Sequence, residues 1–280
     1  MHEIGLSQGV VRYRDQGVGA PMVLIHGLLV NGNIWDRLVP LVASRWRCVV
    51  PDLPLGSHSV PMREDADLSV PGLARLIAEF MERLGLEDVT LVGNDTGGAL
   101  CQVVAANHPE RLGRLVLTNC DAFENFPPPA IRPVVSAMKL PGALAATSVL
   151  ARLRAVRRAA FKAMPLTMEP IADEQVKSWV APLANRGVRA DLAKVVRGID
   201  PAHTLAAAER LRGFDHPALI AWGQEDRFFD FSDAERLAAT LPSSRLERIP
   251  NARTFVQLDA PERLADLIGS VANGAVTAPA

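Results

Sequence analysis

The sequence has few cysteines, a single tyrosine and almost no net charge. Its three cysteines, Cys48, Cys101 and Cys120, each lie in or beside an apolar run, and none forms a CxxC pair. This spacing excludes a disulfide framework and a cysteine-ligated metal site, and it favours three buried thiols in a reducing compartment. The formal net charge of −1 gives no reason to expect nucleic acid or an anionic membrane surface as a partner.

Long apolar segments are missing as well. No stretch approaches the roughly 20 apolar residues of a membrane-spanning helix. The first residues, MHEIGLSQGV, lack the charged and apolar regions of a signal peptide, so we expect a cytoplasmic protein with no membrane partner. The sequence also contains no HExxH, no Cys/His cluster and no GxGxxG after a strand, so we expect neither a metal nor a cofactor.

Short apolar runs alternate with segments of helical periodicity. The runs with strand character are 22–25, 47–52, 88–93, 114–120, 217–223 and 245–250. The helical segments are 33–44, 70–84, 96–107, 232–240 and 260–271. Continuous apolar strands that alternate with helices indicate a mostly parallel, twisted sheet with helices on both faces, which is the α/β fold class.

The segment 124–211 interrupts this alternation, because it contains no strand-like run. It contains FPPP at 126–129 and an Ala/Leu/Arg-rich stretch at 142–164 that predicts one long helix. Ligands of parallel sheets bind beyond the carboxyl ends of the strands. We therefore interpret 124–211 as a helical cap over that edge, and 1–123 together with 212–280 as the core domain. The last residues, 273–280, are typical of a frayed tail.

The stretch GNDTGG at 93–98 has the pattern small-X-nucleophile-X-small, between a predicted strand and a predicted helix. Such a turn is tight and strained, so the residues near the central Asp95 must lack bulk. The turn lifts the Asp95 side chain off the sheet edge. It also directs the Thr96 amide, at the start of the helix, toward the group that Asp95 meets, where it can stabilise negative charge.

Several further segments occur in a familiar order. They are HG at 26–27, PDLPLGS at 51–57, NHPERL at 107–112, WGQEDRFF at 222–229 and DAPERLADLI at 259–268. Together with the turn at Asp95, they resemble the α/β-hydrolase superfamily over almost the whole chain. An aspartate in this turn is similar to the branch of epoxide hydrolases and haloalkane dehalogenases. That resemblance implies that Asp95 attacks carbon and forms an ester that water cleaves, with an oxyanion hole made by the amides of Leu28 and Thr96.

The same resemblance implies a histidine before the last helix, in a Pro-Gly-x-Gly-His-Phe context. This sequence has IPNARTF at 249–255 instead, so Thr254 occupies the histidine position and Arg253 replaces its small neighbour. A threonine hydroxyl cannot act as a base near neutral pH. His203, in GIDPAHTL, is a candidate substitute base or acid, and the alternative is a histidine that only packs in the cap.

Two aspartates are candidates for the acid of the triad. Asp226 lies in WGQEDRFF, where one branch of the superfamily places it, and Asp121 lies where dehalogenases often place it. For either residue, the alternative is an aspartate that only caps a loop, and this alternative is favoured for Asp121. We hypothesise that Arg253 forms an ion pair with Asp226 in place of the missing imidazole.

Residues specific to the two branches are also absent. Epoxide hydrolases use cap tyrosines as acids, but the only tyrosine here is Tyr13, in the N-terminal strand region. Dehalogenases hold the halide with a tryptophan after the nucleophile and often an asparagine after HG. Here these positions are Thr96 and Leu28, which disfavours standard dehalogenation. The missing cap tyrosines likewise disfavour standard epoxide opening.

The predicted pocket is apolar and suits an apolar or aromatic small molecule as substrate. Its expected lining residues are His26, Trp35, Asp121, Phe126, Trp179, Phe228 and Phe255. The arginines at 152, 154, 157 and 158 are interpreted as a solvated helix face. The sequence is compatible with a monomer or a homodimer.

Three interpretations of function remain open. The first is a hydrolase in which Asp95 is the nucleophile and the base is weak or displaced. The second is a lyase, dehydratase, isomerase or cyclase in which Asp95, its pKa raised in a dry pocket, shuttles a proton. The third is a binding protein without chemistry. The resemblance favours the hydrolase class.

Overall fold

A single sheet organises the chain. The structure is a computed structural model that describes residues 1–272, so the tail predicted at 273–280 lies outside the described residues. The sheet has the strand order β1-β2-β4-β3-β5-β6-β7-β8. Its strands are β1 (His2–Leu6), β2 (Gly9–Gln16), β3 (Ala20–Ile25), β4 (Trp46–Asp52), β5 (Val89–Asp95), β6 (Leu112–Cys120), β7 (Ala218–Gly223) and β8 (Ser244–Ile249).

The parallel part of the sheet is the part that the apolar runs predict. β1 pairs antiparallel with β2, and β2 pairs antiparallel with β4. All pairs from β4–β3 to β7–β8 are parallel. The α/β-hydrolase fold expected from the sequence, with a mostly parallel sheet and helices on both faces, is therefore confirmed.

Both faces of the central strands are buried, because successive side chains point to opposite sides. Val23 and Ile25 belong to the core on one face, and Met22 and Leu24 belong to the core on the other. The first core includes residues of α2 (Val70–Arg83), α3 (Thr96–Asn107), α9 (Pro201–Leu211) and α10 (Phe231–Thr240). The second includes residues of α1 (Val39–Val42), α11 (Val256–Asp259) and α12 (Pro261–Ala272).

The helix predicted at 33–44 is wrong in its extent. The structure has a 3₁₀ turn, η1 (Gly32–Trp35), followed by the short helix α1. Pro40 lies in the first turn of α1. Proline has no amide hydrogen and fits the first turn of a helix, so it starts a new helix here instead of continuing the previous one.

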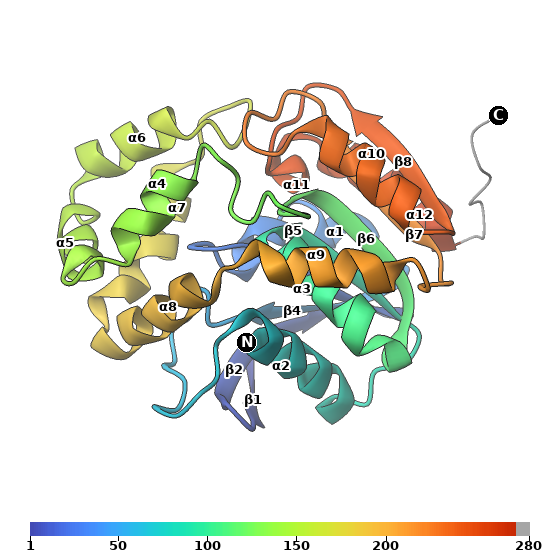
Figure 1. Ribbon diagram of the computed structural model, residues 1–280, viewed down its shortest axis with the longest axis horizontal. Helices are drawn as coiled ribbons and strands as arrows, with labels where there is room; N and C mark the ends of the chain where they lie inside the picture. The colour runs from blue at the N-terminus through green and yellow to red at the C-terminus, as the bar shows by residue number, and fades with distance from the viewer. Residues whose placement is uncertain (273–280) are drawn as a thin grey trace.

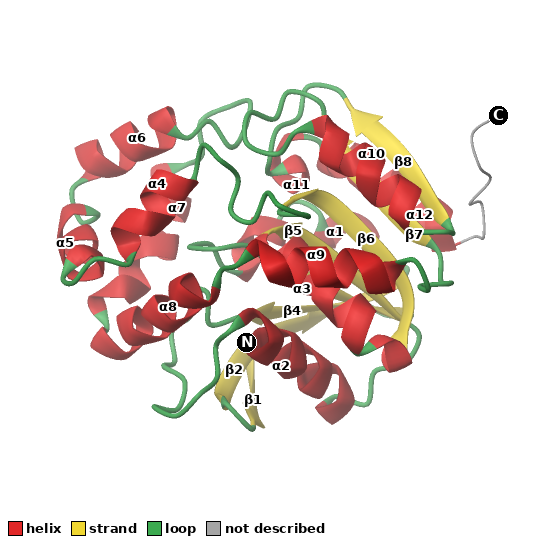
Figure 2. Cartoon of the chain, in the orientation of Figure 1, coloured by secondary structure: helices red, strands yellow, loops and turns green. Residues whose placement is uncertain are grey.

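The segment between β6 and β7 contains helices and loops without a strand, as Figure 2 shows. Its helices are α4 (Arg132–Met138), α5 (Ala143–Leu150), α6 (Arg154–Ala163), α7 (Asp173–Val180), η3 (Ala181–Ala184), α8 (Arg186–Gly198) and α9. In Figure 1, α4 to α8 lie together at the left, beside the sheet, whereas α9 crosses in front of α3. The α9 residues Ala207, Ala208 and Leu211 are buried in the same core as α2 and α3.

The single long helix predicted at 142–164 is two helices, α5 and α6. Because the helix breaks here, the carbonyls of Ala151 and Arg152 do not accept the usual hydrogen bonds from backbone amides of a continuing helix. The guanidinium of Arg157 donates to both carbonyls at 2.9 Å and binds both carboxylate oxygens of Asp173. Arg157 is only 7% exposed, so the interpretation of this residue as part of a solvated face is wrong. It joins α6 to α7 and to the end of α5.

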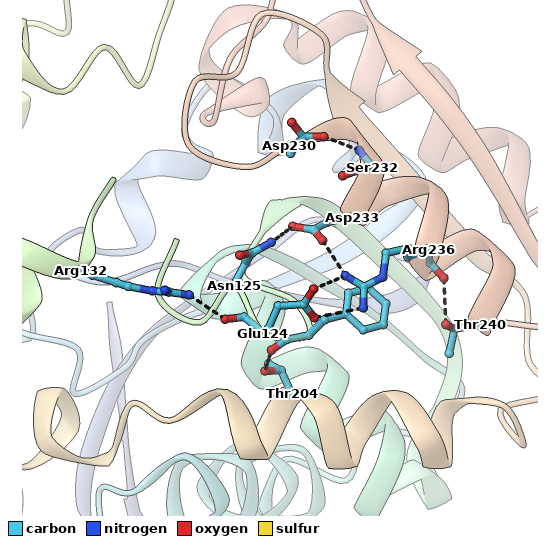
Figure 3. A network of polar contacts seen from close by, with 10 residues as sticks. Glu124, Asn125, Arg132, Thr204, Asp230, Ser232, Asp233, Arg236 and Thr240 are labelled. Carbon is cyan, nitrogen blue, oxygen red and sulfur yellow. Dashed lines mark hydrogen bonds and ion pairs between the residues drawn. The ribbon is translucent and has the colours of Figure 1, made fainter. Parts of the chain in front are cut away.

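A second polar network attaches the start of the cap to the core (Figure 3). Arg236 of α10 donates to both carboxylate oxygens of Glu124 and lies 3.5 Å from the buried carboxylate of Asp233. Asn125 donates to Asp233 at 2.8 Å. The loop that follows β6 is thereby held against α10, which keeps the chain entering the cap in a defined position.

No single helix among residues 1–272 is long and apolar enough to cross a membrane. The helices α4 and α5, taken together, are long and apolar enough for a membrane span, but the chain bends by 105° between them.

We predict that Arg157→Met destabilises the cap. The substitution leaves the Asp173 carboxylate without its partner and two carbonyls without a donor. We expect the free energy of unfolding to fall by about 2 to 4 kcal/mol, near the lower end for a broken buried pair, because the Asp173 side chain retains 17% exposure. Urea unfolding monitored by circular dichroism measures the change. Arg158→Met is the matched control on the exposed side of α6, and an equal loss in both variants would contradict the prediction.

Candidate active site

Asp95 ends β5 in a backbone conformation that few residues adopt. Its φ is 56° and its ψ is −135°, which is strained for a residue with a side chain. The backbone at the neighbouring glycines is packed so closely that it holds Asp95 in this conformation. A Cβ at Gly97 would lie 2.4 Å from the His26 carbonyl oxygen, and one at Gly98 would lie 2.3 Å from the Cβ of Cys120. The turn predicted around Asp95 is therefore present, with its backbone pressed against β3 and β6.

Two backbone amides meet the Asp95 carboxylate. The amides of Leu28, after β3, and Thr96, at the first turn of α3, lie near the carboxylate and lower its pKa. The Leu28 amide can reach it because a Cβ at Gly27 would lie 2.1 Å from Asp95 Oδ2, so only glycine fits there. The pair of amides expected to form an oxyanion hole is thus aimed at Asp95 itself.

His26 shapes this turn and does not line the cavity, so its assignment to the pocket is wrong. Its Nδ1 hydrogen-bonds the Gly27 carbonyl at 2.9 Å, and its Nε2 accepts from the Leu53 amide at 2.8 Å. Burial lowers the pKa of the His26 imidazole, which keeps the ring neutral, as an acceptor at Nε2 requires. The imidazole holds the loop after β3 against the loop after β4.

Burial raises the pKa of Asp95 to about 7. The desolvation of its carboxylate is the largest cause, and the hydrogen bonds from Thr96 and Leu28 oppose it. The negative charge of Asp226 raises the pKa further. Near neutral pH, the group therefore exists in comparable amounts as a carboxylate and as a carboxylic acid.

The Asp226 carboxylate is held by four donors. Asn119 donates to Oδ2 at 2.6 Å, and the amides of Phe228 and Phe229 donate to Oδ1 at 2.7 and 3.2 Å. The hydroxyl of Thr254 donates to Oδ1 at 3.1 Å. Burial nevertheless raises the pKa of Asp226.

The proposed ion pair between Arg253 and Asp226 is not formed. The Arg253 guanidinium points toward the cap and donates to the Thr167 carbonyl at 2.8 Å. Its backbone amide donates to Asp259 Oδ2 at 2.9 Å. The physical reason is that neighbouring side chains of an extended loop point in opposite directions, so only Thr254 faces Asp226.

Asn94, Asn119 and Gln257 connect this loop to the turn at Asp95, and the sequence analysis did not identify them. The Asn94 side chain donates to the Thr254 carbonyl at 2.7 Å and accepts from Gln257 at 2.9 Å. Asn119 receives a hydrogen bond from the Gly223 amide at 2.6 Å. Polar residues at the ends of otherwise apolar strands were the available signal for Asn94 and Asn119.

An apolar cavity of about 400 Å³ opens above Asp95. Asp121, Phe126, Phe228 and Phe255 line it as expected, together with the apolar side chains of α4 to α7. Trp35 and Trp179 are fully buried and do not line it; this part of the pocket assignment is wrong. Trp179 packs against two lining rings, those of Phe161 and Phe255, with centroid distances of 5.9 and 6.0 Å.

His203 is not brought to this cavity. It lies in the first turn of α9, half-buried, and is absent from the cavity wall. Its helix packs on α3, away from the cavity. Thr204, the next residue, donates to the Phe123 carbonyl and attaches this end of the helix to the loop after β6. Among residues 1–272, no group of three His, Cys, Asp or Glu side chains could hold a metal ion.

The fold and the turn at Asp95 define the class of protein. The family profile of the alpha/beta hydrolase fold matches residues 20–261, and the chain belongs to this family. It is 30% identical to haloalkane dehalogenase 2 of Mycobacterium tuberculosis over 272 residues, which cover 94% of this chain and 91% of the relative. It is 25% identical to 2-hydroxy-6-oxo-6-phenylhexa-2,4-dienoate hydrolase of Burkholderia cepacia over 287 residues, covering 98% and 95% of the two chains.

A solved structure confirms the fold independently. The crystal structure of an alpha/beta hydrolase fold protein from Burkholderia ambifaria has a TM-score of 0.80 with this chain at 24% identity. The match covers 95% of this chain and 96% of the other.

We predict that Asp95 contributes stability at low pH that is lost as pH rises, whereas the buried His26, whose pKa is lowered, acts in the opposite direction. The folded-state pKa of Asp95 is about 7 and its ordinary value is 3.8, so the folded protein binds the proton more tightly. This contribution to stability is complete below the ordinary value and is lost as pH rises through about 7. The buried carboxyls of Asp121 and Asp226, whose pKa values are also raised, act in the same direction.

The measurement is urea unfolding of the wild type and Asp95→Asn at a series of pH values. Asparagine tolerates a positive φ, so the variant keeps the turn. We expect the free energy of unfolding to decline less steeply in the variant between about pH 4 and pH 8. Identical slopes would show that Asp95 is not the titrating group.

Proposed function

We propose that this protein is an enzyme that acts on an apolar small molecule, with the Asp95 carboxylate as the nucleophile. One observation carries the proposal. The carboxylate lies on a strained turn at the floor of an apolar cavity, with the amides of Leu28 and Thr96 beside it. A carboxylate placed in this way can attack an electrophilic carbon of a substrate in the cavity.

The first step would join Asp95 to the substrate. A carboxylate oxygen forms a bond to carbon, and the leaving group departs with the electron pair of the bond that breaks. The product is an alkyl ester of Asp95. Water would then attack the carbonyl carbon of this ester. The amides of Leu28 and Thr96 would stabilise the negative charge that develops on the carbonyl oxygen.

The second step would be slow in this chain. The group beside Asp226 is the Thr254 hydroxyl, which donates to the carboxylate and cannot take a proton from water near neutral pH. We infer that Thr254 stands where an active hydrolase of this type has its histidine. The ester would therefore accumulate.

The similarity to haloalkane dehalogenase 2 supports attack on a saturated carbon, which is the reaction that the name of this relative describes. The residues around Asp95 do not support the same leaving group. Thr96 follows Asp95, and Leu28 follows the His26-Gly27 pair, where the resemblance implies halide-holding side chains. We therefore propose that Asp95 attacks a carbon atom of the substrate, and we do not propose a halide as the leaving group.

A second candidate function is proton transfer without an ester, as in a lyase, dehydratase, isomerase or cyclase. The observation in its favour is the pKa of about 7 for Asp95, which suits a group that both accepts and donates a proton near neutral pH. The absence of a water-activating base at Thr254 is compatible with it.

We predict that Asp95 becomes covalently modified. Purified protein is incubated with apolar epoxides, alkyl halides and activated esters, and its intact mass is measured. We expect a stable mass increase in the wild type, located at Asp95 by peptide mapping, and none in Asp95→Asn. Conversion of a substrate without any adduct would favour the proton-transfer candidate, and adducts in both proteins would exclude Asp95 as the nucleophile.

We also predict that Thr254→His creates turnover. An imidazole at this position would lie beside Asp226 and could activate water for attack on the ester. We expect the adduct to disappear with time and the free product to accumulate, with a rate gain of about 100-fold, the lower end for general base catalysis. Thr254→Leu tests the effect of size without a base. A variant that folds but keeps its adduct would contradict the role assigned to position 254.

A further inference from the structure

The cavity contains a second carboxyl group that the proposed function does not use. Its ionisable lining residues are Asp95, Asp121 and Arg157. The donors of Arg157 are occupied by Asp173 and by the carbonyls of Ala151 and Arg152. Two carboxyl groups, Asp95 and Asp121, are therefore left to meet a substrate in an otherwise apolar space.

Neighbouring strand ends bring the two carboxyls together. Asp95 is the register partner of Cys120 across the β5–β6 pair, and Asp121 is the next residue. Thr96 lies between them, because its hydroxyl donates to Asp121 Oδ2 at 3.2 Å and its amide lies near the Asp95 carboxylate. The other oxygen, Asp121 Oδ1, is buried and has no hydrogen-bond partner among residues 1–272.

Burial and mutual repulsion disfavour the ionisation of both groups together. Asp121 is 2% exposed, and the charged groups that raise its pKa are Asp95 and Asp233, after the larger effect of burial. Arg236 offsets part of the charge of Asp233, and Asn125 donates a hydrogen bond to it, as Figure 3 shows. The negative charge of Asp226 also raises the pKa of Asp95. Two close carboxyls in an apolar site lose their protons in two separate steps, so one proton is retained to a higher pH than the other.

We propose that Asp121 is the proton donor to the leaving atom while Asp95 attacks carbon, and that the substrate is therefore an apolar epoxide or similar strained ether. This inference rests on the proposed nucleophilic role of Asp95. In the step, Asp95 Oδ forms a bond to a ring carbon, the carbon–oxygen bond breaks, and the oxygen receives the Asp121 proton. The products are the hydroxyalkyl ester of Asp95 and an ionised Asp121.

The choice of oxygen as leaving atom follows from basicity. A halide ion is a very weak base and leaves without a proton, so a carboxylic acid beside the nucleophile would serve no purpose. An alkoxide is a strong base and leaves far more easily when an acid protonates it. Tyr13 cannot supply this proton, because it lies in β2 and packs against Phe80. Asp121 is the acid within the described residues that lines the same cavity as Asp95.

The test compares two phenyl-substituted electrophiles, of which only one needs a proton on its leaving atom. Wild type, Asp121→Asn and Asp233→Asn are each incubated with styrene oxide and with phenethyl iodide, and the rate of ester formation on Asp95 is followed by intact-protein mass. Asp233→Asn is the matched control, because it removes a buried carboxyl that does not line the cavity. Thermal unfolding of each variant confirms that it is folded.

We expect Asp121→Asn to slow the reaction with styrene oxide by about 100-fold or more, the usual contribution of a general acid. Its reaction with phenethyl iodide should persist. Asp233→Asn should lose far less of its reaction with styrene oxide, because Asp233 affects Asp121 only through its charge. Equal loss with both electrophiles, or no loss with either, would overturn the proton-donor role of Asp121. A wild type that reacts with neither would instead overturn the nucleophilic role of Asp95.

A pH profile supplies a second readout. With styrene oxide, the wild-type rate should rise as the first proton leaves the Asp95–Asp121 pair and fall as the second leaves, which gives a bell shape. With phenethyl iodide, the rate should rise without a falling limb. A bell-shaped profile in Asp121→Asn with styrene oxide would contradict the proposal.

Discussion

The strained backbone of Asp95 is the constraint on which the site depends. A positive φ at a residue with a side chain persists only if the surroundings hold it. Here the Gly97 backbone presses against the carbonyls of Ile25 and His26, and Gly98 presses against Cys120. β3, β5 and β6 thus fix the turn from both sides. The strain places the carboxylate above the sheet edge, where the amides of Leu28 and Thr96 reach it.

The environment of the site determines the chemistry available to Asp95. An apolar cavity disfavours ionised carboxyls, so Asp95, Asp121 and Asp226 all have raised pKa values. The donors around Asp226 stabilise its charge partly, and Thr254 is one of them. The Thr254 hydroxyl makes a hydrogen bond to Asp226 but cannot act as a base. The arrangement is suited to forming a bond to Asp95 or moving a proton, and poorly suited to cleaving an ester with water.

The fold was predictable where local patterns carried the information. Strands with both faces buried read as continuous apolar runs, and the turn at Asp95 needs glycines that are visible in the sequence. The break between α5 and α6 was not predictable, since it depends on Arg157 reaching Asp173 from another helix. The same is true of the wall of the cavity. Trp179 was expected to line the cavity because it is a large apolar residue of the cap. It instead packs behind the wall, against the rings of Phe161 and Phe255.

The sequence by itself determined the α/β-hydrolase fold, the position of Asp95 and the threonine at position 254, because each is written in a short stretch of neighbouring residues. Only the tertiary structure decided which polar groups meet. It directed Arg253 to Thr167 and Thr254 to Asp226, left His203 outside the cavity, and brought Asp121 beside Thr96. These contacts join residues far apart in the chain, and their geometry follows from strand register and packing, which no local pattern records.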